Sequence, residues 1–372
     1  MNHPGNTHAQ KPGNTGSPQG DRATGELRLV AWETTRNCNL SCVHCRASAN
    51  MGPFSGELDT AAAYRLLDEI VQVGNPIIIL TGGEPLLRPD IFEIAAYGTG
   101  KGLRMTMAPN GTLITPENAR KMKETGIQRI SISIDGSSKE AHDRFRGVPG
   151  AFEGALRGIE LAKSVDLEFQ INTTITQTNL AQLPDILKLA ENLGAVAHHI
   201  FLLIPTGRGK YIADQEISAQ EYESTLNWFY DHRDRTSMQL KATCAPHYYR
   251  ILRQRAKEEA KAITFQTHGM DAVTRGCLGG TGFCFVSHRG IVQPCGFLDL
   301  NCGDVTQTPF YDIWRHSEHF ITLRNYKNLK GKCGRCEYKN VCGGCRARAF
   351  EATGDFLQEE PLCSYQPASS LS

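Results

Sequence analysis

The distribution of cysteines is the feature of this chain that most restricts its fold. Of 13 cysteines in 372 residues, three lie within residues 38–45 and ten lie after residue 243, with none between Cys45 and Cys244. A chain without the apolar stretch of a secretion signal uses so many cysteines more often as metal ligands or catalytic groups than in disulfides. The pattern therefore divides the chain into a cysteine-free middle and two cysteine-bearing ends.

The first three cysteines, Cys38, Cys42 and Cys45, have the spacing C-x3-C-x2-C directly after an apolar segment. A structural zinc ion takes four protein ligands, and disulfides need an even number of thiols. Three thiolates on a four-iron cubane, in contrast, leave one iron for an exchangeable ligand. Two other interpretations remain open: a zinc site completed by a distant ligand such as His44, and three unrelated core cysteines.

Between the two cysteine-bearing ends, apolar segments alternate with amphipathic helices. Six such units predict an α/β fold with a parallel sheet, closed or nearly closed as a barrel, and with chemistry at the carboxyl ends of the strands. We expect strands at 27–33, 76–80, 103–109, 128–135, 167–176 and 195–205, and helices at 60–74, 90–100, 115–126, 150–164 and 183–194.

Composition and charge exclude some classes of protein. The net charge of +1 and the 21% of charged residues argue against a general nucleic-acid binder. No apolar run approaches the roughly 20 residues of a membrane-spanning helix. Residues 1–26 are rich in Gly, Pro, Asn and Thr, which predicts a disordered tail.

The regular alternation of apolar segments and amphipathic helices ends after residue 206. We expect the barrel domain to occupy residues 27–240 and a helical bridge to occupy residues 241–274. Residues 275–372 contain too little apolar sequence for a core of their own, so we expect metals to stabilise this last domain.

The segment TGGEP at 81–85 directly follows the second expected strand. Gly82 and Gly83 would let a ligand approach the backbone closely, and Glu84 offers an acceptor for an ammonium group. Together with C-x3-C-x2-C one β/α unit earlier, this segment resembles the radical S-adenosylmethionine (AdoMet) superfamily over about residues 27–206.

The resemblance implies a partial (β/α)6 radical SAM barrel. It implies that the first three cysteines hold a [4Fe-4S] cluster whose open iron binds AdoMet, while the GGEP segment contacts the amino group of AdoMet. It further implies AdoMet contacts at the ends of strands four and five, where the candidates are Ser133, Asp135 and Asn172.

The late cysteines form two spaced groups. Paired C-x2-C units are also typical of zinc ribbons, so a structural zinc module remains an alternative. The order of these cysteines resembles the SPASM extension of radical SAM enzymes, which implies two auxiliary [4Fe-4S] clusters, although the last internal spacing here is two residues rather than the usual three. The resemblance assigns one cluster to Cys277, Cys284, Cys295 and Cys345 and the other to Cys333, Cys336, Cys342 and Cys363, and leaves Cys244 and Cys302 over.

Several longer segments, among them 241–256 and 275–290, resemble a family of tetrapyrrole-modifying radical SAM enzymes, the AdoMet-dependent heme synthases. This resemblance implies decarboxylation of two propionates of iron-coproporphyrin III to vinyls, an external one-electron donor and an oxygen-poor cytoplasm. Arginine suits carboxylate recognition, so the candidate substrate contacts are Arg208, Tyr248 and Arg250, with His198, His199 and His247 as candidates near the substrate iron.

Three alternatives to this function stay open. The first is a related tetrapyrrole enzyme, such as a didecarboxysiroheme deacetylase or a heme d1 maturation enzyme. The second is a peptide-modifying SPASM enzyme, and the third is a zinc-binding nucleic-acid module, which the near-neutral charge disfavours.

Overall fold

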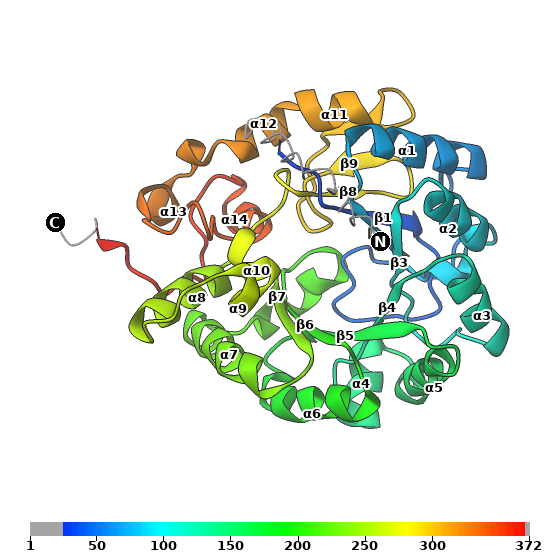
Figure 1. The fold of residues 1–372 in the computed structure, drawn as a ribbon, viewed down its shortest axis with the longest axis horizontal. Helices are drawn as coiled ribbons and strands as arrows, with labels where there is room; N and C mark the ends of the chain where they lie inside the picture. Colours follow the sequence, from blue (N-terminus) through cyan, green and yellow to red (C-terminus); the bar gives the residue numbers. More distant parts are fainter. Residues whose placement is uncertain (1–24, 369–372) are drawn as a thin grey trace, which may run out of the picture.

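A strongly curved sheet forms the frame of the molecule (Figure 1). The structure is a computed structural model that describes residues 25–368, so the tail expected at 1–26 lies almost entirely outside the described residues. Within them, the sheet has ten strands in the order β10 (Gly303–Asp304), β9 (Ile291–Gln293), β8 (Phe283–Val286), β1 (Leu29–Thr35), β2 (Ile77–Gly82), β3 (Arg104–Met107), β4 (Arg129–Ser133), β5 (Glu168–Ile175), β6 (Ala197–Leu202) and β7 (Gln239–Thr243).

Strands β1 to β7 are all parallel, and helices cover the convex side of this part of the sheet (Figure 1). The predicted α/β partial barrel is therefore confirmed. The covering helices are α1 (Thr60–Val73), α2 (Ile91–Gly100), α3 (Pro116–Glu124), α5 (Ala151–Lys163), α6 (Leu183–Leu193) and α7 (Ala219–His232).

The helix boundaries follow local capping chemistry. Thr115 caps α3, accepting a hydrogen bond from the Asn118 amide at 3.1 Å. Asp59 caps α1 in the same way, accepting from the Ala62 amide at 2.7 Å.

One short helix and one strand of the barrel region illustrate what the sequence prediction omits. Helix α4 (Lys139–Arg146) is short and mostly charged, KEAHDRFR, so it carries little apolar periodicity. Strand β7 adds a seventh parallel strand beside β6, inside the region where a helical bridge was expected to begin. The remainder of that bridge is helical, as α8 (His247–Glu258), α9 (Phe265–His268) and α10 (Met270–Val273).

The two faces of the barrel sheet differ in polarity. Every second strand residue packs into the main core beneath the helices, as Val30, Ile78, Ile130 and Ile200 do. The alternate residues face the concave side and remain partly exposed; they include Thr106, Ser131, Ser133, Asn172, Thr174, His199 and Lys241. The concave wall is therefore largely polar along β3 to β7, whereas Ala31, Ile77 and Ile79 make it more apolar at β1 and β2.

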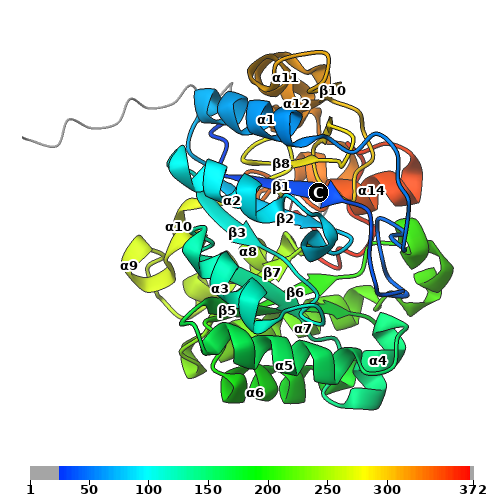
Figure 2. The ribbon, with the colours of Figure 1, turned by 90° about the vertical axis from the view of Figure 1, so that its right-hand side faces the viewer.

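The C-terminal region continues this sheet. Strand β8 pairs in parallel with β1, with Cys284 opposite Val30, and β9 and β10 follow antiparallel. Helix α11 (Phe310–His316) lies beside α1 (Figures 1 and 2), where the Phe310 amide donates to Glu69 at 2.6 Å, and α12 (Glu318–Arg324) follows α11. Two helices follow in the cysteine-rich part, α13 (Gly331–Arg335) and α14 (Arg346–Thr353). None of the described helices is long and apolar enough to cross a membrane.

Candidate active site

The loop that carries the first three cysteines leaves β1 at its carboxyl end and is tied down on two sides. On one side, the amides of Ser41 and Val43 donate to the carbonyls of Arg146 and Phe145, at 3.1 and 3.0 Å. On the other side, Arg208 at the end of β6 donates to the carbonyls of Cys42 and Ala49, at 2.8 and 2.7 Å. These contacts hold the loop between α4 and the segment after β6.

The structure brings the three thiols of this loop together. Cys38 and Cys42 belong to one small apolar cluster against which Cys45 packs. Each sulfur accepts one hydrogen bond: Cys38 from the Leu40 amide at 3.4 Å, Cys45 from the Ala49 amide at 3.4 Å, and Cys42 from Arg146 at 3.6 Å. These donors stabilise thiolates, the form that binds iron.

The electrostatics of the loop favour a bound cation. Burial, together with the neighbouring Cys42, Glu84 and Cys45, raises the pKa of the Cys38 thiol to about 11, against a partial opposing effect of the Leu40 amide. A buried thiol of this kind loses its proton readily only when a metal replaces it. The donor set thus fits an iron–sulfur cluster held by three thiolates.

Arg146 is a site residue that the sequence analysis missed. It lies at the end of α4, is 8% exposed, and its guanidinium contacts both the Cys42 sulfur and the carboxylate of Asp135. A lone arginine in a charged octapeptide gives no sequence signal of this role, because only the tertiary fold carries α4 onto the cysteine loop.

The glycines of the GGEP segment allow close packing against the chain itself, whereas the sequence predicted close approach of a ligand. A Cβ added to Gly82 would lie 2.2 Å from the Thr35 carbonyl oxygen, and one added to Gly83 would lie 2.2 Å from that of Asn37. The residues without Cβ therefore let the GGEP segment lie directly against the entry to the cysteine loop, and the amide of Glu84 donates to the Asn37 carbonyl at 2.7 Å.

The carboxylate of Glu84 is fully buried. It accepts hydrogen bonds from the amides of Asn110 and Leu86, at 2.6 and 3.1 Å. Burial raises its pKa to about 7, even though the two amides oppose the shift. Glu84 thus fixes the turn between β2 and the loop after β3.

The three residues expected to contact AdoMet at strand ends differ in the exposure of their side chains. Ser133 and Asn172 are directly paired across β4 and β5 and lie partly exposed on the concave wall. Asp135 is 1% exposed, and its carboxylate is engaged by Arg146 and by the Thr174 amide at 2.7 Å. The first two can therefore meet a ligand, whereas Asp135 orients Arg146.

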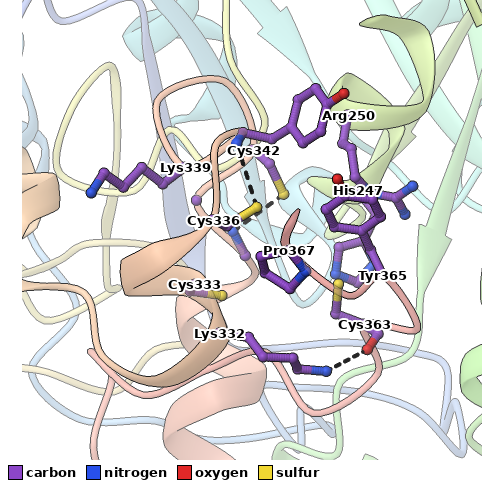
Figure 3. Close-up of a pocket in the computed structure, with 13 residues that line it drawn as sticks. His247, Arg250, Lys332, Cys333, Cys336, Lys339, Cys342, Cys363, Tyr365 and Pro367 are labelled. Carbon is purple, nitrogen blue, oxygen red and sulfur yellow. Dashed lines mark hydrogen bonds between the residues drawn. The ribbon is translucent and has the colours of Figure 1, made fainter. Parts of the chain in front are cut away.

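Four of the late cysteines line one pocket (Figure 3). These are Cys333, Cys336, Cys342 and Cys363, the second expected set, together with His247 and Arg250 from α8. Backbone amides donate to three of the sulfurs at 3.4 Å, from Glu360, Tyr338 and Gly344. Arg346 also donates to the Cys333 sulfur at 3.6 Å.

The other expected set is divided in the structure. Cys295 packs against the apolar cluster that contains Cys345, and the Cys277 amide donates to the Cys342 carbonyl at 3.2 Å. Cys284 instead lies in the core beneath the outer helices, in the same cluster as Cys302.

The spacing of these groups differs from that of a single-ion site. Among residues 25–368, no three histidine, cysteine, aspartate or glutamate side chains are gathered tightly enough to hold one metal ion. Thiolates on a cubane stand farther apart than those around one zinc ion, because each binds a different iron.

Two family models match this chain. The model of the radical SAM superfamily matches residues 32–190, and the SPASM model, described as an iron-sulfur cluster-binding domain, matches residues 277–345. The AdoMet-dependent heme synthase of Nitratidesulfovibrio vulgaris is 62% identical over 340 residues, which cover 91% of this chain and 93% of that protein. This chain belongs to the radical SAM superfamily, in the family of AdoMet-dependent heme synthases.

More distant relatives lie in the same superfamily. The heme synthase of Methanosarcina barkeri is 55% identical over 92% of this chain and 98% of that protein. The pre-heme d1 synthase of Dinoroseobacter shibae is 32% identical over 90% of this chain and 85% of that protein.

Solved structures support the fold alone. Streptococcus suis SuiB bound to the precursor peptide SuiA has a TM-score of 0.74 at 14% identity, over 92% of this chain and 77% of that one. The enzyme anSMEcpe with AdoMet and a peptide has a TM-score of 0.64 at 20% identity, over 89% of this chain and 92% of that one.

The three residues expected to contact substrate are placed differently in the structure. Arg208 ties down the cysteine loop, as described above. Tyr248 is 1% exposed, and Arg250 is ion-paired with Glu223 beside the four-cysteine pocket. Arg208 and Arg250 thus bind other protein groups, whereas the buried Tyr248 hydroxyl has no hydrogen-bond partner among the described residues.

The three candidate histidines also differ in the exposure of their side chains. His198 and His247 are buried, and burial lowers the pKa of each to about 4. His199 lies on the concave wall opposite Asn172 and Lys241, where Gln170 contacts its ring at 3.0 Å. Of the three, His199 is the one placed to meet a ligand in the barrel.

Proposed function

We propose that this chain converts Fe-coproporphyrin III to heme b by oxidative decarboxylation of two propionates to vinyls, with release of carbon dioxide, methionine and 5′-deoxyadenosine. The observation that carries the proposal is the identity of 62% with a heme synthase over 91% of this chain. The three-thiol loop at the carboxyl end of β1 supports it, because it offers the open iron that AdoMet cleavage needs.

The cluster held by Cys38, Cys42 and Cys45 supplies, when bound, the electron that cleaves AdoMet. The protein's own residues fix this loop: Arg208 holds its backbone, and Arg146 donates to the Cys42 sulfur. Such outer contacts orient metal ligands and adjust their potential. The partly exposed side chains of Ser133, Asn172 and His199 on the concave wall are placed to orient AdoMet and the tetrapyrrole.

We propose three [4Fe-4S] clusters in all, and hence about 12 irons per chain. The auxiliary clusters of the C-terminal region would accept the electron that leaves the substrate in each round. A reduced external protein would supply electrons to the first cluster. An oxygen-poor cytoplasm suits this cofactor content, because a cluster with an open iron is easily oxidised.

The test is an anaerobic assay of the reconstituted full-length chain. We expect Fe-coproporphyrin III, AdoMet and a one-electron reductant to yield heme b, with one AdoMet cleaved for each vinyl formed, as measured by mass spectrometry. Cleavage of AdoMet without vinyl products would move the activity to another substrate, such as a related iron tetrapyrrole or a peptide.

Two variants make the assay specific. Cys42→Ala should abolish formation of 5′-deoxyadenosine, and Cys342→Ala should retain some cleavage while blocking product formation. Cys302→Ala is the matched control, because Cys302 lies in the apolar core away from both cysteine groups described above, and it should retain heme formation.

A further inference from the structure

Cys244 follows the last barrel strand, β7, in an unusual backbone conformation. Its φ of 57° is one of four positive values at non-glycine residues within the described part of the chain. This conformation costs an L-residue about 1 kcal/mol or more, and it persists where surrounding contacts fix it. Here the Cys244 carbonyl accepts from the Tyr222 hydroxyl at 2.8 Å and from Arg348 at 3.4 Å. Both donors are buried.

The segments of two other cysteines meet the Cys244 segment. A Cβ added to Gly276 would lie 2.5 Å from the Cβ of Pro246 and 2.8 Å from the Cys342 carbonyl oxygen. The chain before Cys277 is thus pressed against the chain after Cys244. Cys345 directly precedes α14, and Arg348 on that helix is one of the two residues that donate to the Cys244 carbonyl.

The side chains converge as well. Cys244 and Cys295 both pack against the apolar cluster formed by Ile204, Leu298, Cys345 and Ala347. The thiols that neighbour Cys244 are those of Cys345, Cys295 and Cys277. Four thiols from four separate segments therefore lie in one neighbourhood.

Cys284 lies elsewhere. It pairs with Val30 in the β8–β1 ladder, is fully buried, and belongs to the core cluster that contains Trp314 and Phe320. The neighbouring groups that affect the pKa of its thiol are Cys302 and Arg324. Because a strand fixes the side to which each side chain points, Cys284 cannot turn to the other face without breaking the ladder.

We propose that Cys244, and not Cys284, is the fourth thiolate that joins Cys277, Cys295 and Cys345 on an auxiliary [4Fe-4S] cluster at the carboxyl end of β7. The inference rests on the proposed function for the presence of that cluster. With four protein thiolates the cluster has no open iron, so its role is electron transfer rather than binding of AdoMet or substrate. Its position joins the barrel wall to the C-terminal region.

The experiment measures cluster content and not heme formation. The full-length chain carrying Cys38→Ala, Cys42→Ala and Cys45→Ala should hold about eight irons after anaerobic reconstitution. Adding Cys244→Ala should lower this by one to four irons and produce the EPR signal of a three-iron cluster on oxidation. Adding Cys284→Ala, the matched control, should leave iron content and spectrum unchanged.

Opposite results overturn the proposal. Loss of iron in the Cys284→Ala chain, or unchanged iron and EPR spectra in the Cys244→Ala chain, would each reject it. If Cys244→Ala does not fold, Cys244→Ser preserves the side-chain shape, and an EPR spectrum identical to that of the parent would reject the proposal. A parent that holds only about four irons would instead contradict the cluster count of the proposed function.

Discussion

Arg146 connects the cysteine loop to the strand ends of the barrel through two buried contacts. Its guanidinium donates to the Cys42 sulfur at 3.6 Å and is ion-paired with Asp135, whose side chain has no exposed surface. A buried ion pair of this type contributes little net stability, but removing one partner leaves an uncompensated charge. Arg146 therefore positions the cluster loop, and its removal would leave the Asp135 carboxylate buried without its partner.

We predict that Arg146→Met lowers the free energy of unfolding by about 3–5 kcal/mol, because it leaves the Asp135 carboxylate buried without its partner. Urea unfolding of the iron-free protein measures this. The double variant Arg146→Met/Asp135→Asn should recover most of the loss, because the asparagine oxygen still accepts from Thr174. A double variant no more stable than the single one would show that the charge is not the cause.

His198 predicts a dependence of stability on pH. Burial lowers its pKa from 6.5 to about 4. Above pH 6.5 neither state binds the proton; as the pH falls from 6.5 to 4, the unfolded chain binds it and the folded chain does not. The contribution of His198 to the free energy of unfolding should therefore fall by about 3 kcal/mol over this window, in addition to the effects of the other buried histidines.

The variant His198→Leu, compared with the parent protein, tests this effect. The partner of His198, the Thr173 hydroxyl, also donates to the Ile134 carbonyl at 2.7 Å, so it keeps a hydrogen bond in the variant. Chemical unfolding at several pH values should show a flatter profile for the variant. Parallel profiles for both proteins would assign the acid sensitivity to other groups.

At the scale of elements, strand β1 has the central place. It pairs with β2 on one side and with β8 on the other, so the C-terminal region supplies the strand that covers one edge of the barrel. An uncovered edge of this kind promotes aggregation. The barrel and the cysteine-rich region are therefore coupled by backbone hydrogen bonds as well as by proposed clusters.

We predict that deletion of residues 275–372 yields a protein that aggregates, because it exposes the β1 edge and the side of α1 that α11 covers. Size-exclusion chromatography measures this. The full-length chain with alanine at Cys333, Cys336, Cys342 and Cys363 is the control: it keeps β8, and it should remain monodisperse. A monodisperse deletion variant would show that β8 is dispensable for the barrel.

At the scale of the whole molecule, the structure combines a barrel with an apolar outer core and a C-terminal end with little core of its own. The four-cysteine pocket lies between α8, α13 and the last described residues (Figures 1 and 3). Its walls contain few large apolar side chains. We therefore expect the proposed cluster to contribute directly to the stability of this end.

We predict that iron removal increases hydrogen exchange in residues 331–345 and 360–365 by at least tenfold, while α1 changes little. Mass spectrometry of the iron-free and reconstituted chains measures this, and α1 serves as the internal reference. Equal protection in both forms would indicate that protein contacts alone order the C-terminal end.

The sequence by itself determined the local features of this protein. The alternation of strands and helices, the cap of α3 at Thr115 and the three-cysteine loop after β1 all depend on residues close together in the chain. The first two features follow from periodicity and capping, and the third from fixed spacing. The grouping of Cys333, Cys336, Cys342 and Cys363 came from the family resemblance, and the four residues line one pocket.

Only the tertiary structure decided which distant residues meet. In the structure Arg146 contacts Cys42, and Arg208 donates to the backbone of the cysteine loop. Cys284 lies in the main core, whereas Cys244 packs against the cluster that contains Cys345. Spacing along the chain cannot specify these pairings, because strand register and the packing of separate segments set the side to which each side chain points.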